Sequence, residues 1–100
     1  MAVVFLTITP IGTATPSVSR YVAGVERILR ASGLKHQLTA MGTIVEGELG
    51  AILGVVREMH EHPFTQGAVR VSTLIKIDDR RDKEHTIAGK MRSVEEKLKG

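Results

Sequence analysis

The chain has 100 residues, of which 42% are hydrophobic and 25% are charged, and its formal net charge is +3. These values are typical of one globular domain, so we expect a single domain over residues 1–100 and little tendency to bind nucleic acid or membrane. Cysteine is absent, which excludes disulfides, thiolate metal sites and a cysteine nucleophile.

Residues 3–9 predict a first β-strand, because β-branched residues dominate them and turn-forming residues follow at 10–16. This apolar start lacks the basic leading segment and the cleavage site of a signal peptide. No apolar stretch reaches the roughly 20 residues that span a bilayer. We therefore expect a cytoplasmic protein.

A first amphipathic helix is predicted from the end of that turn to Gly33. Thr15 is a suitable N-cap, and Pro16 suits the first helical position, where a missing N–H costs nothing. Apolar residues then recur at helical spacing until Gly33 supplies a C-terminal cap.

Two strands, residues 34–41 and 43–47, follow and are joined tightly around Gly42. A second helix has its apolar stripe on Leu49, Ile52, Leu53, Val56 and Met59. We expect Pro63 to disturb its last part and Gly67 to end it.

Residues 69–77 predict a fourth strand, and a third helix is expected from about Thr86, with Ile87, Met91, Val94 and Leu98 on one side. The order of elements is two strand-helix-strand halves followed by a helix. This order predicts an α+β, ferredoxin-like βαββαβ sandwich, with a four-stranded antiparallel sheet, helices on one face and a C-terminal helix.

The other face of such a sheet is uncovered by its own helices. Strand alternation places apolar and threonine side chains there, because both faces of residues 3–9 carry apolar groups. An uncovered face of this kind usually meets another subunit or a ligand, so we expect a homo-oligomer.

Two carboxylates, Glu46 and Glu48, fall at the end of the third strand. Glu48 is expected to serve the start of the second helix, where acidic groups are favoured. Glu46 shares a face with Ile44, and a buried carboxylate there would need a cation or convergent donors. From the pattern alone, a solvated Glu46 and a ligand-binding Glu46 both remain open.

Four other kinds of site are less well supported. Residues 15–22 place Ser17, Ser19 and Arg20 at a helix start that could bind phosphate, yet the surrounding glycines match no phosphate-binding motif. His60 and His62 point to different sides of a helix, so no metal site is expected. Three aromatic residues are too few for an RNA-binding sheet, and no nucleophile with a base is present, so we expect no enzyme.

Several segments, in this order and spacing, resemble the MTH1187-like family of thiamine-binding proteins, formerly an uncharacterised family. They are "PIGT" at 10–13, "SVSRYVAGVERILRASGL" at 17–34, "MGTIVEG" at 41–47, "RVSTLIKIDDRRD" at 70–82 and "KMRSVEEKL" at 90–98. The resemblance implies a ferredoxin-like fold, a homotetramer, and thiamine or its hydroxymethylpyrimidine part bound without chemistry and without a cofactor.

Carried to matching positions, the resemblance makes Thr43 and Glu46 the first candidate ligand-binding residues, with Glu46 accepting from the aminopyrimidine or facing the thiazolium charge. It adds, at the same end of the domain, Ser17, Ser19 and Gly12. Strand geometry, rather than the family, suggests as wall residues Thr7, Thr39 and Met41.

The leading hypothesis is therefore a non-enzymatic binder of thiamine or hydroxymethylpyrimidine for salvage, transport or sensing. The alternative is a structural or regulatory oligomeric interaction protein without a specific ligand. A small-molecule enzyme is a third option, which lacks an acid-base pair.

Overall fold

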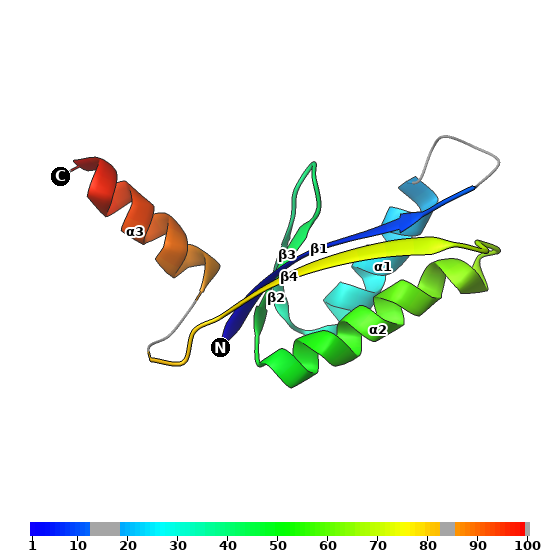
Figure 1. Cartoon of the computed structure of the whole chain (residues 1–100), viewed down its shortest axis with the longest axis horizontal. Helices are drawn as coiled ribbons and strands as arrows, with labels where there is room; N and C mark the ends of the chain where they lie inside the picture. Colours follow the sequence, from blue (N-terminus) through cyan, green and yellow to red (C-terminus); the bar gives the residue numbers. More distant parts are fainter. Residues whose placement is uncertain (13–18, 83–85, 100) are drawn as a thin grey trace.

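The computed structural model describes residues 1–12, 19–82 and 86–99 of the chain (Figure 1). Seven elements follow one another: β1 (Ala2–Pro10), α1 (Ser19–Ser32), β2 (Lys35–Leu38), β3 (Thr43–Gly47), α2 (Leu49–Thr65), β4 (Val71–Asp79) and α3 (Ile87–Lys99). The predicted order of elements is confirmed.

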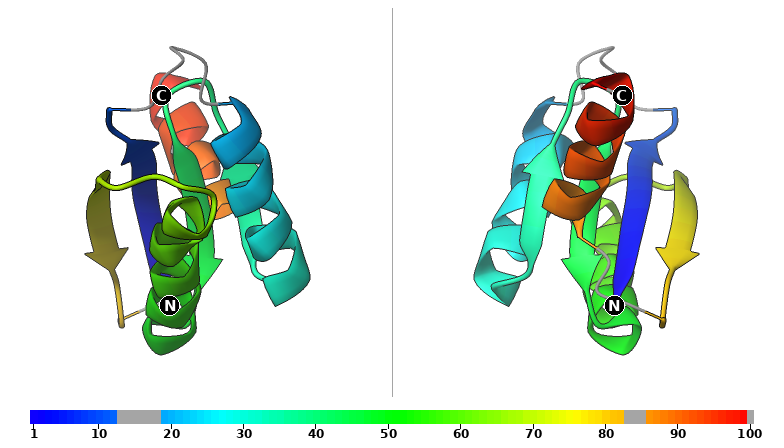
Figure 2. Two further views of the ribbon diagram at one scale, coloured as in Figure 1. Left: turned by 90° about the vertical axis from the view of Figure 1, so that its right-hand side faces the viewer. Right: turned by 90° about the vertical axis from the view of Figure 1, so that its left-hand side faces the viewer.

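The four strands form one antiparallel sheet in the order β2-β3-β1-β4. The two end-on views of Figure 2 show the strands side by side, with β4 at one edge. This strand order, with β1 in the centre beside the last strand, is that of the ferredoxin-like sandwich, so the predicted fold class is confirmed.

Helices α1 and α2 cover one face of this sheet and enclose the core. Alternation along the central strands directs Ala2, Val4, Leu6 and Val45 to that face, where they meet Leu29 of α1 and Ile52, Val56 and Met59 of α2. All eight of these side chains are buried. The opposite face of the sheet, called here the open face, carries Val3, Phe5, Ile44, Lys76 and Asp78, the residues between those of the core in the strand register.

Several predicted boundaries are wrong by a few residues. Strand β2 ends at Leu38 rather than residue 41, because Thr39 begins a hydrogen-bonded turn. Strand β4 runs two residues later than predicted, since Pro10, the last residue of β1, pairs with Val71. The predicted cap of α1 at Thr15 and Pro16 lies outside the described residues.

Pro63 does not disturb α2, in contrast to the prediction. The helix continues to Thr65 because Pro63 lies in its last turn, where the missing N–H removes a single helical hydrogen bond and the ring is fully buried. The Pro63 carbonyl accepts from the amides of Gln66 and Ala68 as the chain leaves the helix. Gly67 then follows with φ +98°, so the predicted stop is confirmed.

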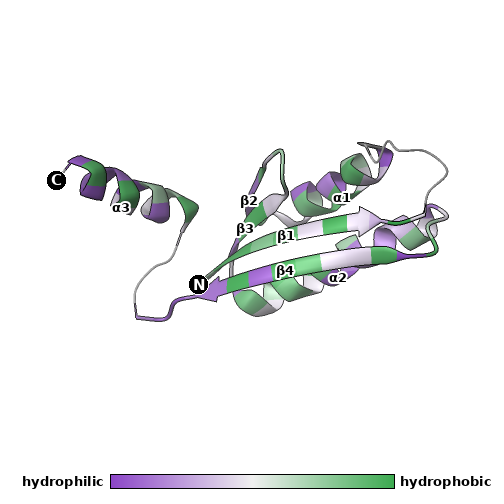
Figure 3. Ribbon diagram, turned by 45° about the horizontal axis from the view of Figure 1, so that its top comes forward, coloured by the Kyte–Doolittle hydropathy of each residue, from purple (hydrophilic) through white to green (hydrophobic). Residues whose placement is uncertain are grey.

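Helix α3 extends away from the body of the domain (Figure 1). Thr86 precedes it, and the Thr86 hydroxyl accepts from the Gly89 amide at 2.9 Å. The apolar residues of α3 form a stripe between charged ones (Figure 3), and three of them, Met91, Val94 and Leu98, are 62%, 56% and 82% exposed. None of the helices in the described ranges is long and apolar enough to cross a membrane.

Candidate functional site

The sheet is split beyond the middle of β1. Strand β1 pairs with β3 only from Ala2 to Leu6, where Leu6 lies opposite Thr43, whereas its pairing with β4 continues to Pro10. Among the described residues, the β3-facing edge of β1 therefore has no ladder partner from Thr7 to Thr9. Because successive residues of a strand direct their backbone groups to alternate neighbours, some of these N–H and C=O groups point into the split.

A cavity of about 400 Å³ occupies this split and continues under α1. Its wall comes from three places, namely the second half of β1, the middle of α1 and the β2–β3 hairpin. The lining residues are Leu6, Thr7, Ile8, Thr9, Val22, Val25, Glu26, Leu38, Thr39, Ala40, Met41, Gly42 and Thr43. Ile8 packs on the core side of β1 and its neighbours Thr7 and Thr9 lie on the other side, so the cavity reaches both faces of the sheet edge.

The hairpin that forms one wall is held by Thr39. Its hydroxyl donates to the Gly42 carbonyl at 2.8 Å and accepts from the amides of Met41 and Gly42 at 3.2 and 3.1 Å. The Thr39 amide also donates to the Gly42 carbonyl at 2.8 Å. Gly42 packs so tightly that a Cβ there would lie 2.7 Å from the Phe5 ring and 2.9 Å from the Leu6 carbonyl oxygen. This turn keeps the hairpin in a fixed shape beside the cavity.

Among the described residues that line this cavity, Glu26 is the one with a charged side chain. It is 14% exposed, and its Oε1 atom lies 2.8 Å from Nε2 of His36 and 3.4 Å from Nε of Arg30. The other ring nitrogen of His36, Nδ1, lies 2.9 Å from the Leu34 carbonyl. Acceptance by the Leu34 carbonyl and by Glu26 raises the pKa of His36, although burial and the nearby Arg30 oppose this.

Four of the predicted ligand-binding residues line this one cavity: Thr7, Thr39, Met41 and Thr43. Thr43 is buried and Met41 is 82% exposed, so the cavity opens at the hairpin. Gly12 follows the end of β1, and Ser19 begins α1; neither is among the lining residues. Ser17 lies outside the described residues.

Glu46 lies on the open face, on the other side of the sheet from Thr43. Its side chain is buried, and its Oε2 atom accepts from the Ile87 amide at 2.6 Å. A carboxylate at this position satisfies a free N–H group of the first turn of α3 and interacts favourably with the helix dipole. Glu46 thus connects β3 to the start of α3.

Glu48 caps α2, as the sequence predicts. Its two carboxylate oxygens accept from the Gly50 and Ala51 amides, both at 2.9 Å. These two backbone donors lower the pKa of Glu48. Glu46 and Glu48 therefore serve the starts of different helices, while Glu26 faces the cavity.

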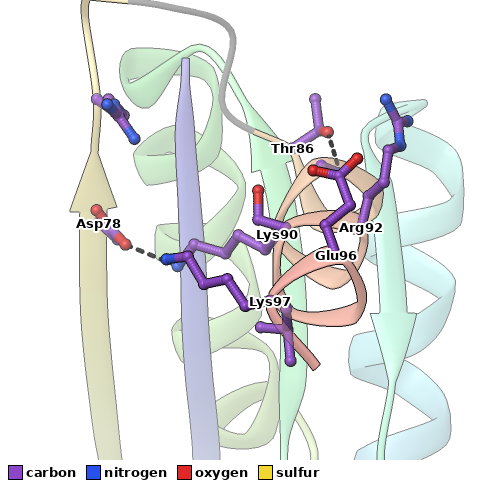
Figure 4. Close-up of a pocket in the computed structure, with 10 residues that line it drawn as sticks. Asp78, Thr86, Lys90, Arg92, Glu96 and Lys97 are labelled. Carbon is purple, nitrogen blue, oxygen red and sulfur yellow. Dashed lines mark hydrogen bonds and ion pairs between the residues drawn. The ribbon is translucent and has the colours of Figure 1, made fainter. Parts of the chain in front are cut away.

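Two further hollows lie between α3 and the open face. The smaller, about 250 Å³, is bounded by apolar residues of β1, β3 and α3 and by Lys76, Asp78 and Lys90. The wider one, about 960 Å³, is shown in Figure 4 and is lined mostly by charged and polar side chains of α3. Lys90 closes part of it through an ion pair with Asp78 at 2.7 Å. The charged side chains that line the two hollows are mostly exposed, so among the described residues neither hollow presents an enclosed carboxylate like that of Glu26.

The histidines of "MHEHP" separate in the structure. Nδ1 of His60 lies 2.6 Å from the Thr73 hydroxyl and its ring meets Phe64 edge-on, whereas His62 packs against Gly24 of α1. Within the described ranges, no group of three or more His, Asp or Glu side chains is placed to hold a metal ion.

The fold and the cavity define a ferredoxin-like domain with a small-molecule-sized hollow at a split in its sheet. Residues 4–95 match the model of a family described as thiamine-binding protein, and the chain belongs to this family. The resemblance inferred from the sequence is thereby confirmed.

Relatives span nearly the whole chain. The UPF0045 protein YqgV of Bacillus subtilis is 52% identical over 98% of both chains, and a UPF0045 protein of Methanothermobacter thermautotrophicus is 38% identical over 93% of this chain and 95% of its own. The crystal structure of the Methanocaldococcus jannaschii protein MJ1052 superposes with a TM-score of 0.85 at 37% identity, covering 95% of this chain and 96% of that one. A Thermotoga maritima protein, named as a candidate for thiamine biosynthesis or salvage, shares the fold with a TM-score of 0.76 at 22% identity over 93% of this chain and 97% of that one.

Proposed function

We propose that this protein binds thiamine or its hydroxymethylpyrimidine part, without catalysis, in the cavity between α1 and the split sheet. The observation that carries the proposal is an enclosed carboxylate, Glu26, in a cavity of about 400 Å³ lined otherwise by apolar, hydroxyl and glycine residues. Small-molecule sites typically have 300–1,000 Å³ and a few placed polar groups in an apolar wall.

The groups around the cavity match the polar atoms of an aminopyrimidine. Both contacts of Glu26 with described residues are made by Oε1, which leaves Oε2 to accept from an exocyclic amine or to face a thiazolium cation. The unpaired backbone of residues 7–9 and the hydroxyl of Thr43 supply further donors and acceptors. Val22, Val25 and Met41 offer apolar surface to the rings.

This assignment gives the carboxylate role to Glu26, because Glu46 lies on the opposite face and its Oε2 accepts from the α3 amide. The described residues that line the site include no nucleophile hydrogen-bonded to a base, which supports binding rather than turnover. A binder of this kind, in the cytoplasm, could serve salvage, transport or sensing of the vitamin.

Thermal unfolding and titration calorimetry test the proposal. Thiamine at 100 times its dissociation constant should stabilise the fold by about 2.7 kcal/mol, a rise on the order of 10 °C for a domain of this size. Glu26→Gln should weaken thiamine binding by roughly 1.5–3 kcal/mol, the usual contribution of a charged hydrogen bond.

Glu46→Gln is the matched control, since it makes the same chemical change on the other face. Its binding isotherm should stay within about threefold of the wild type, below the ~1.4 kcal/mol that corresponds to a tenfold change. No thermal shift with millimolar thiamine or hydroxymethylpyrimidine would contradict the proposal and favour a purely structural or regulatory interaction protein. Equal losses in both variants would remove the distinction between the two faces.

We also propose that the chain forms a homo-oligomer, with a tetramer as the expected state. The support is the exposed apolar stripe of α3, Met91, Val94 and Leu98, together with Leu74 and Ile77 of the edge strand β4, which are 61% and 44% exposed. Light scattering after size-exclusion chromatography measures the assembly. Met91→Glu should reduce it, whereas Lys97→Glu, also on α3, should preserve it; a monomeric wild type would contradict this proposal.

A further inference from the structure

The contact between Glu26 and His36 links the cavity to a titrating group. Glu26 lies on α1 and lines the cavity, while His36 lies on β2. Their side chains are only 14% and 16% exposed, so solvent and salt screen the interaction weakly. A change of charge on either side chain therefore changes the protonation free energy of the other.

The geometry around His36 determines how many protons the pair carries. Nδ1 faces the Leu34 carbonyl at 2.9 Å and Nε2 faces Oε1 of Glu26 at 2.8 Å. A carbonyl and a carboxylate are both acceptors, so the ring satisfies both contacts only when both of its nitrogens carry a proton. Placing that proton on Glu26 instead would give the same total, and Arg30, 3.4 Å from Oε1, favours the ionised carboxylate.

A cationic ligand in the cavity would interact with the same Glu26 carboxylate as the protonated His36 ring. It would approach the carboxylate that already faces His36 and Arg30, and three cations around one carboxylate repel each other. Of the two resident cations, the His36 ring can lose its charge by releasing a proton, whereas the guanidinium of Arg30 cannot at ordinary pH. The neutral ring can still donate from Nδ1 to Leu34.

We propose that Glu26 and His36 couple ligand binding to proton release: binding of a cationic ligand beside Glu26 releases the proton held by His36. This inference rests on the proposed function and adds a regulation to it. Within that site, His36 is a positioning residue, which fixes Oε1 of Glu26 and sets the charge that a ligand meets. The raised pKa of His36 agrees with a proton held in the ligand-free protein.

The charged groups near His36 come from α1, whereas the neighbouring strand residues place no charge on its side of the sheet. Glu26 favours the charged ring and Arg30 opposes it, both from α1. On β3 the residue opposite His36 is the uncharged Val45, and Lys35 on β2 lies opposite Glu46 on the other side of the sheet. The pH dependence should therefore follow the His36 ring.

Calorimetry with thiamine between pH 6 and 8.5 measures the proton release directly. Titrations in two buffers of different ionisation enthalpy should show release of up to one proton, and thiamine affinity should rise by up to about tenfold per pH unit below the pKa of His36. His36→Gln retains a donor for Glu26 but does not titrate, so its affinity should be independent of pH. His60→Gln, which changes a histidine of α2 that contacts Thr73 of β4 and not Glu26, should keep the wild-type profile.

A measurement without ligand tests the same pair independently. The NMR titration of the His36 ring should give a pKa above the ordinary value of about 6.5, and Glu26→Gln should lower it. A His36 pKa that does not fall in Glu26→Gln would overturn the proposed coupling to proton release, whether or not thiamine binds. Thiamine binding that does not depend on pH, or that depends on pH equally in His36→Gln, would overturn the coupling to proton release and leave the proposed function intact. Absence of binding at every pH would overturn both proposals.

Discussion

The two halves of β1 differ in how the sheet surrounds them. From Ala2 to Leu6 the strand is paired on both sides, and the start of α3 lies beside its open face, where Glu46 accepts from the Ile87 amide. From Thr7 to Pro10 its ladder partners in the described part of the chain all lie on β4, and the other side is a cavity with Glu26 in its wall. One half uses a carboxylate to fix a helix, and the other presents one to a hollow. The comparison shows that the role of a carboxylate depends on which groups lie within hydrogen-bonding distance of it. Whether the residue lies on a strand or on a helix matters less.

Gly42 lies at the border between the two halves, and its substitution should have the largest effect on stability. In Gly42→Ala the new methyl group would meet the Phe5 ring and the backbone oxygen of Leu6 within 3 Å, and the backbone cannot move away easily. Overpacking of this kind costs about 1–3 kcal/mol. Chemical denaturation should show the loss, and thiamine affinity should fall too because the hairpin wall shifts.

Gly54→Ala is the control for that prediction. Gly54 lies within α2, and no neighbouring atom lies within 4 Å of a Cβ built there. Because alanine favours the helix more than glycine does, this variant should be as stable as the wild type or slightly more so. If Gly42→Ala is as stable as Gly54→Ala, the backbone at Gly42 can shift away from Phe5 and Leu6, and the hairpin turn is not rigid.

Glu46→Gln should weaken the link between the paired half and α3. The amide keeps an acceptor oxygen but loses the charge that interacts with the helix start, a change of about 0.5–1.5 kcal/mol. Hydrogen exchange at the Ile87 amide should become faster, whereas the amides of the β2–β3 hairpin should keep their wild-type rates. Unchanged exchange at Ile87 would remove the capping role of Glu46.

Glu48→Gln offers a second helix-capping carboxylate for comparison and should lower the melting temperature by a few degrees at pH 7. The folded protein lowers the pKa of Glu48, so the stabilisation is present above the unfolded pKa of about 4.5 and is lost as pH falls through the lower folded value. The difference between Glu48→Gln and the wild type should therefore disappear in acid. A difference that is the same at pH 7 and pH 3 would contradict this role.

His36→Gln should have the smallest effect on stability, below about 1 kcal/mol, because glutamine keeps a donor for Glu26 and only the charge of the ring is lost. The pKa of His36 is raised on folding, so its stabilisation is full below the unfolded value near 6.5 and is lost as pH rises through the folded value. The wild type should exceed His36→Gln in melting temperature at pH 6 and match it near pH 9. The opposite trend would show that His36 is held neutral.

The fold was predictable from the sequence because its signals are local and repeated. Two strand-helix-strand halves, each with a glycine of positive φ after its helix, Gly33 and Gly67, specify the ferredoxin-like order. The limits of β2 and β4 were not predictable from the strand pattern alone. A local side-chain turn at Thr39 ends β2, and the pairing of Pro10 with the distant Val71 sets the start of β4; strand periodicity shows neither of them.

The structure brings four of the predicted site residues to one cavity, and their role as ligand-binding residues stays a prediction. Strand geometry suggested Thr7, Thr39 and Met41, and the resemblance added Thr43. Glu26 was missed because it reads as one of the charged residues of an amphipathic helix. A signal existed: Glu26 follows Val22 by four residues and Val25 by one, so it borders the apolar stripe. Its partner His36 is ten residues further on, and only the fold brings the two together.

The turn at Thr39 also determines whether the cavity exists at all. If the ladder between β1 and β3 continued in its present register beyond Leu6 and Thr43, Gly42 would lie opposite Thr7 and Met41 opposite Ile8, and the hollow would close into continuous sheet. The turn prevents this continuation because the chain reverses direction between Thr39 and Gly42, and the Thr39 hydroxyl holds that reversal through its bonds to Met41 and Gly42. A single threonine hydroxyl therefore acts as a stop on the growth of the sheet, and the cavity is the length of strand that it leaves unpaired.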